Sequence, residues 1–83
     1  MEMTAVVQYL GDLAHYSITP ESDGIFSAQL LKYEGPNVVT PPHNLVLVRG
    51  VRKWVGSYEE QYFVEELGRA IDERVRDGEP HSM

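Results

Sequence analysis

Residues 44–72 read NLVLVRGVRKWVGSYEEQYFVEELGRAID, and this stretch decides the fold class of the 83-residue chain. It opens with an apolar, β-branched run, which is typical of a strand. Basic residues around the only tryptophan follow, and then a glycine and an amphipathic segment. The stretch therefore predicts a strand followed by a helix, with positive charge concentrated between them.

The helix is predicted to begin at Ser57. Its hydroxyl is placed to accept from the amide of Glu60, while the Glu60 carboxylate reaches back to the amide of Ser57. Apolar side chains then recur at helical spacing, and they are Phe63, Val64, Leu67, Ile71 and Val75. Asp72 and Arg76 are spaced to pair on the opposite side. Gly68 costs a helix about 1 kcal/mol relative to alanine, which indicates either a close approach to the sheet or simple tolerance.

Three further strands are predicted upstream, over residues 4–10, 14–19 and 25–33, with the second ended by Pro20. The fourth strand spans residues 44–55 and is expected to bend at Gly50. The predicted fold is α+β: an antiparallel four-stranded sheet in the order β-β-β-β-α, with one C-terminal amphipathic helix packed on one face. Residues 1–78 are expected to form a single domain, followed by a disordered tail over residues 79–83.

The composition excludes several classes of function. The chain carries 13 acidic and 7 basic residues, for a net charge of −6, and it has no cysteine. No segment is typical of a signal peptide or a membrane span, so we expect a cytoplasmic protein without membrane contact. The three histidines, His15, His43 and His81, lack metal-ligand spacing. We therefore predict no metal, no cofactor, no catalytic residues and no enzymatic activity.

A candidate binding surface is formed by Arg49, Arg52, Lys53 and Trp54. Three of the seven basic residues fall within these positions, which leaves 4 basic against 13 acidic residues elsewhere. Exposed rings beside positive charge suit single-stranded nucleic acid, although the negative net charge opposes it. The other interpretation is that the charges point to water while Trp54 packs under the helix. In element order alone, the chain resembles a family of single-stranded-DNA-binding transcriptional coactivators that dimerise, and element order does not transfer function.

A second candidate contact is the proline-rich loop GPNVVTPPHN, residues 35–44. Its residues Val38, Val39, Pro41 and Pro42 form a candidate partner loop, because prolines stiffen a loop and lower the entropy cost of binding. The alternative is that the two valines fold back as a lid on the core.

The predicted function is that of a small non-enzymatic interaction module, a homodimer joined through a sheet face or edge. One helix cannot cover both faces of a sheet, and the predicted sheet carries Tyr16, Ile18, Leu31, Tyr33 and Val51. The alternatives are single-stranded nucleic-acid binding through residues 49–54, and a role as accessory subunit or regulator of an enzyme. The predicted partner is therefore the chain itself or another protein.

Overall fold

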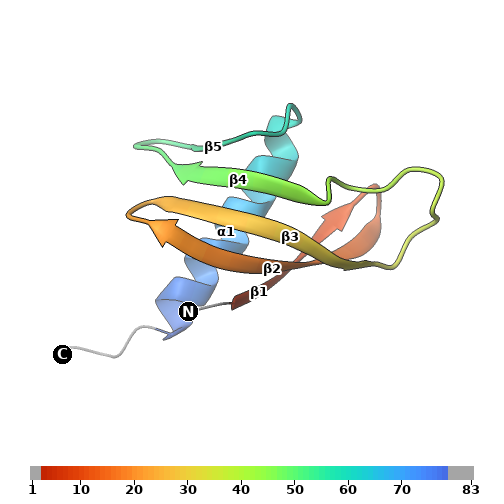
Figure 1. The fold of residues 1–83 in the computed structure, drawn as a ribbon, viewed down its shortest axis with the longest axis horizontal. Helices are drawn as coiled ribbons and strands as arrows, with labels where there is room; N and C mark the ends of the chain where they lie inside the picture. Colours follow the sequence, from red (N-terminus) through yellow and green to blue (C-terminus); the bar gives the residue numbers. More distant parts are fainter. Residues whose placement is uncertain (1–2, 79–83) are drawn as a thin grey trace.

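The computed structural model describes residues 3–78, and it describes side chains as far as Arg74. Within these residues the fold is α+β, with one curled antiparallel sheet backed by a C-terminal helix (Figure 1). The elements are β1 (Met3–Tyr9), β2 (Asp12–Ser22), β3 (Ile25–Tyr33), β4 (Asn44–Arg49), β5 (Trp54–Gly56) and α1 (Gln61–Gly78). The α+β class is confirmed, whereas the described sheet has five strands and not four. The predicted tail, residues 79–83, lies outside the described residues.

Each strand pairs with the next in the chain, so the sheet is a meander in the order β1-β2-β3-β4-β5. The β1–β2 hairpin closes between Tyr9 and Asp12 across a two-residue loop. Both loop residues have positive φ, 53° at Leu10 and 88° at Gly11. Such loops match the twist of the flanking strands, and glycine adopts this backbone without strain. No helix within residues 3–78 is long and apolar enough to cross a membrane.

The predicted end of the second strand at Pro20 is wrong. β2 continues to Ser22, and its register with β3 shifts between Pro20 and Ser22. Proline has no N–H to give to a sheet ladder, so a bulge is a position where a strand tolerates it.

The predicted long strand over residues 44–55 is in fact a hairpin. β4 and β5 pair with each other, with Arg49 opposite Trp54. The amide of Gly50 donates to the carbonyl of Lys53 at 3.0 Å, and a Cβ at position 50 would lie 2.4 Å from that oxygen. Glycine is required at position 50 because the chain reverses direction there, whereas only a bend was predicted from the sequence.

Ser57 continues the sheet and does not cap the helix. Its amide donates to the carbonyl of Val46 at 3.0 Å, and its Oγ accepts from the Val46 N–H at 2.9 Å. The helix begins at Gln61, and the amide of Val64 donates to the Glu60 carbonyl at 3.3 Å. The predicted capping box is absent because the Ser57 hydroxyl is already bound to the neighbouring strand.

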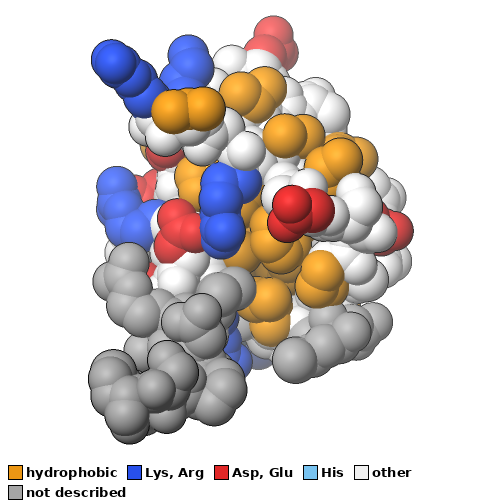
Figure 2. All heavy atoms as spheres, turned by 90° about the vertical axis from the view of Figure 1, so that its left-hand side faces the viewer, with side chains coloured by type: hydrophobic (Ala, Val, Ile, Leu, Met, Phe, Trp, Pro, Cys, Tyr) orange, Lys and Arg blue, Asp and Glu red, His pale blue; other side chains and the backbone are white. Residues whose placement is uncertain are grey.

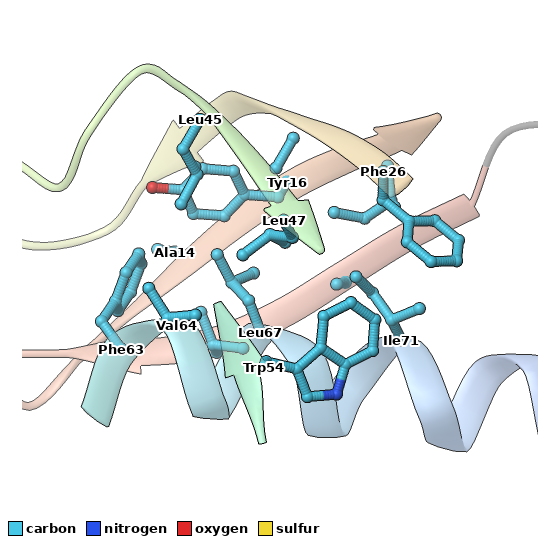
Figure 3. Packing of buried hydrophobic residues seen from close by; sticks show 14 of the residues in the cluster. Ala14, Tyr16, Phe26, Leu45, Leu47, Trp54, Phe63, Val64, Leu67 and Ile71 are labelled. Atoms are coloured by element: carbon cyan, nitrogen blue, oxygen red, sulfur yellow. The ribbon is translucent and has the colours of Figure 1, made fainter. Parts of the chain in front are cut away.

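The core lies between α1 and the face of the sheet that it covers (Figure 3). The predicted helix stripe is confirmed at Phe63, Val64, Leu67 and Ile71, which are all fully buried. Val75 and the predicted partner of Asp72, Arg76, lie outside the described side chains. The sheet contributes Ala5, Val7, Tyr9, Ala14, Tyr16, Ile18, Phe26, Ala28, Leu45, Leu47 and Trp54.

Tyr16 and Ile18 lie on the covered face and are fully buried. Tyr33 also packs against the core, because a register shift between β2 and β3 brings it to the covered side. Leu31 and Val51 are exposed. Val51 lies in the β4–β5 turn and not on the sheet itself.

Candidate functional site

An open cleft of about 510 Å³ lies between the β4–β5 turn and helix α1. We call it the basic cleft, and it is lined by Arg49, Gly50, Val51, Arg52, Lys53, Trp54, Glu65, Arg69 and Asp72. Four of these residues are cations and two are carboxylates, so the lining carries +2 and the rest of the chain −8. Figure 2 looks onto this end of the molecule and shows Lys and Arg side chains gathered on one side, with hydrophobic side chains exposed on the other.

Trp54 forms a wall of the cleft from inside the core. Only 5% of its surface is exposed, and its ring lies 5.6 Å from that of Phe26. A Cβ at Gly68 would lie 2.2 Å from Cγ of Trp54, so the predicted close approach of this glycine to the sheet is confirmed. The indole Nε1–H of Trp54 donates to Asp72 Oδ2 at 3.2 Å. The interpretation in which Trp54 packs under the helix is confirmed, and the ring offers no stacking surface, because a base can stack only on an exposed ring.

Arg49 is held against this wall. Its Nη2 lies 2.6 Å from Asp72 Oδ1, and its guanidinium carbon lies 5.3 Å from the centre of the Trp54 ring and 5.9 Å from that of Phe26. One carboxylate of α1 thus binds both Arg49 and Trp54. The charge of Arg49 is compensated, and its role in the structure is to fix the hairpin on the helix.

Arg52 and Lys53 are the exposed cations of the turn, and the structure adds Arg69 from the helix. Arg69 pairs with Glu66 at 3.0 Å on the helix surface. Arg69 was not among the predicted site residues, although helical spacing places it on the same side as Glu65 and Asp72. The structure thus brings Arg52 and Lys53 together with Arg69 and separates them in role from Arg49.

The candidate partner loop is divided into an exposed tip and an anchored base. Val38 is 89% exposed and Val39 is about half exposed, so neither acts as a lid on the core. Pro41 is buried, and the carbonyl of Pro42 accepts from the Tyr16 hydroxyl at 2.6 Å. The four residues therefore do not form one contact surface.

The open face is the side of the sheet turned away from α1. Its apolar part, the valine band, consists of Ile25, Val46, Val48 and Val55, which the β3–β4 and β4–β5 registers bring side by side. The three valines are each between about a third and a half exposed. Beside the band lies a shallow hollow of about 260 Å³ with an uncharged lining that includes Ser17, Thr19, Ser27, Gln29 and Asn44. The middle of the open face is thus uncharged and partly apolar.

Three tyrosines meet near the β1–β2 turn. The Tyr33 hydroxyl donates to the carbonyl of Tyr9 at 3.0 Å, and the hydroxyls of Tyr9 and Tyr58 lie 3.3 Å apart. That hydrogen bond raises the pKa of Tyr58, and burial raises it further. Burial also raises the pKa of Tyr16. A raised pKa keeps the phenols of Tyr16 and Tyr58 protonated, so they act as structural hydrogen-bonding groups.

The histidines do not converge. His15 Nε2 lies 2.8 Å from Glu34 Oε2, His43 is exposed in the loop, and His81 is outside the described residues. Within residues 3–74 no three His, Cys, Asp or Glu side chains are grouped as metal ligands. Comparisons of the chain with protein-family models, curated proteins and solved structures found no match. The geometry of the basic cleft and the open face is therefore the basis for assigning a function.

Proposed function

We propose that this domain is a small non-enzymatic interaction module that forms a homodimer through the open face of its sheet. The observation that carries the proposal is the valine band, an apolar strip left without a covering element in a sheet whose other face is fully packed. Exposed contiguous apolar surface on a small protein is typical of a contact site.

Both edges of the sheet are less suited to pairing than the face. At the β5 edge, Gln61 Nε2 donates to the carbonyl of Trp54 at 2.7 Å. On β1, at the other edge, Arg74 Nε donates to the carbonyl of Thr4 at 3.2 Å. Side chains that bind edge strands, and a β5 of only three residues, hinder the addition of another strand. This supports the face over the edge as the dimer contact.

The charge distribution supports a second copy of this chain as the partner of the open face. Each chain carries −6, so two copies repel wherever their acidic surfaces meet. The middle of the open face carries no charge, and at its margin the Glu21 carboxylate accepts from Ser27 Oγ at 2.7 Å. Two open faces can therefore meet without placing like charges directly opposite each other.

The area of the open face is close to the minimum for a specific interface. Five strands at about 4.8 Å each, with about six residues at about 3.3 Å each, give a flat area of roughly 480 Å². Two copies would together bury about 960 Å² of flat area, and the side chains that project from the sheet add to this value. The total is close to the lower bound of roughly 1,000 Å² for a specific interface. We therefore expect a dimer of modest, micromolar affinity and not an obligate one.

Sedimentation equilibrium tests the proposal. The wild-type protein should change from its monomer mass of 9.4 kDa to twice that value as concentration rises. The double substitution Val46→Lys and Val48→Lys should keep it monomeric without lowering its melting temperature, because both side chains already face solvent in the monomer. Val38→Lys, at the exposed loop tip, is the matched control and should dimerise normally. A wild-type protein that stays monomeric at millimolar concentration would refute the dimer.

A further inference from the structure

We infer that the basic cleft binds the carboxylates of an acidic segment on a protein partner. Arg49 and Arg69 are each paired with a carboxylate of the helix. No carboxylate among the described side chains lies within ion-pair distance of Arg52 or Lys53. In a chain with an excess of acidic residues, two adjacent cations that form no ion pair among the described side chains are available for an external anion.

The turn that presents these cations is held in place. The amide of Gly50 donates to the Lys53 carbonyl at 3.0 Å, and the amide of Arg49 donates to the carbonyl of Gly24 in the neighbouring hairpin at 2.7 Å. Asp72 fixes the Arg49 side chain from the helix. The backbone therefore does not have to be ordered when a ligand binds, which removes one of the main costs of association.

The lining favours a short acidic segment over a nucleic acid. Glu65 and Asp72 stand in the cleft and the rest of the chain carries −8, so a continuous phosphate backbone would be repelled. The one aromatic residue in the lining, Trp54, is buried and offers no stacking surface. A short acidic segment ends beyond Arg52 and Lys53, so its carboxylates do not have to extend along the acidic surface of the rest of the chain.

An apolar contact is also available beside these cations. Val51, which precedes Arg52 in the turn, is fully exposed. A segment with carboxylates next to an apolar side chain therefore matches both the charge and the hydrophobic character of this turn. The cleft lies on the helix side of the sheet, so this proposal does not depend on a dimer through the open face.

Nuclear magnetic resonance with a capped hexaglutamate peptide tests this site. The indole N–H of Trp54 gives an isolated signal because the chain has one tryptophan, and it is bound to Asp72 in the cleft wall. At low salt, hexaglutamate should shift this signal and the amides of Arg52 and Lys53, and high salt should abolish the shifts. A capped serine–glycine peptide of the same length should cause none.

Substitutions then locate the binding. The double variant Arg52→Gln and Lys53→Gln should weaken hexaglutamate binding by roughly three- to thirtyfold, the effect of two solvent-exposed ion pairs. Arg52→Gln alone should weaken it more than Lys32→Gln, which removes one exposed charge at the far end of β3. These variants should sediment like the wild type, so failure of this proposal is distinguishable from failure of the dimer.

Three results would overturn the inference. The first is the absence of any shift with millimolar hexaglutamate at low salt. The second is an equal loss of affinity in Lys32→Gln and Arg52→Gln, which would mean that net charge and not the cleft controls binding. The third is tighter binding of a single-stranded oligonucleotide than of hexaglutamate at the same residues and ionic strength, which would assign the cleft to phosphates.

Discussion

Replacing Gly68 with alanine tests the contact between helix and sheet that forms the wall of the basic cleft. A Cβ at position 68 would lie 2.2 Å from both Cδ1 and Cγ of Trp54. Carbon atoms in contact are normally about 3.5–4.0 Å apart, so either the indole or the helix must move by about 1.5 Å. Cγ is bonded directly to Cβ of Trp54, and rotating the ring therefore does not relieve the collision.

The expected loss of stability follows from three contributions. Alanine favours the helix by about 1 kcal/mol over glycine, whereas forcing extra volume into a packed core costs about 1–3 kcal/mol. Displacing the indole also weakens its 3.2 Å hydrogen bond to Asp72, at a cost of about 1 kcal/mol. Gly68→Ala should therefore destabilise the protein by about 1–3 kcal/mol, which lowers the melting temperature by about 5–20 °C in a domain of this size.

A double-mutant cycle with Trp54→Val isolates the contact. Without the ring, Gly68→Ala should stabilise the protein by up to about 1 kcal/mol, because only the helix preference remains. Unfolding in urea, followed by far-ultraviolet circular dichroism, gives the free energy of all four proteins without relying on tryptophan fluorescence. The reasoning is refuted if Gly68→Ala raises the stability of the wild-type protein, or if its effect is the same with and without the indole.

Two further predictions concern Tyr16 and Ser57. Burial raises the pKa of Tyr16 in the folded state, so its contribution to stability is complete below about pH 10 and is lost as the pH rises further. Tyr16→Phe should therefore flatten the fall in stability above pH 10 in circular dichroism, and an unchanged slope would contradict this. Ser57→Ala should cost about 0.5–1.5 kcal/mol and speed hydrogen exchange at the Val46 amide, whereas faster exchange at residues 61–64 would identify Ser57 as a helix cap after all.

Features that depend on near neighbours could be predicted from the sequence. The stripe from Phe63 to Ile71 follows from helical spacing alone. The interpretation of residues 44–55 failed because alternating side chains fit a bent strand and a hairpin equally well. The choice between them rests on pairing across the hairpin and on the bonds between Ser57 and Val46, which no local pattern records.

The prediction of the candidate binding surface was wrong in part for the same reason. Arg49, Arg52 and Lys53 are close in the sequence, and closeness suggested a shared surface. The register that sets Arg49 opposite Trp54 turns it toward the core and Asp72, while the turn leaves the other two exposed. Side-chain direction in a hairpin depends on its register, and a change of one residue reverses it.

Trp54 consequently acts on the cleft through packing and not through contact with a ligand. Gly68 admits the indole, Asp72 binds its N–H, and the same carboxylate holds Arg49 beside the turn. Substitutions along this chain of contacts are expected to change folding and cleft geometry together, so a loss of binding in them does not identify a ligand contact. Arg52 and Lys53 are not part of that chain and are exposed, which makes them the positions where binding can be separated from stability.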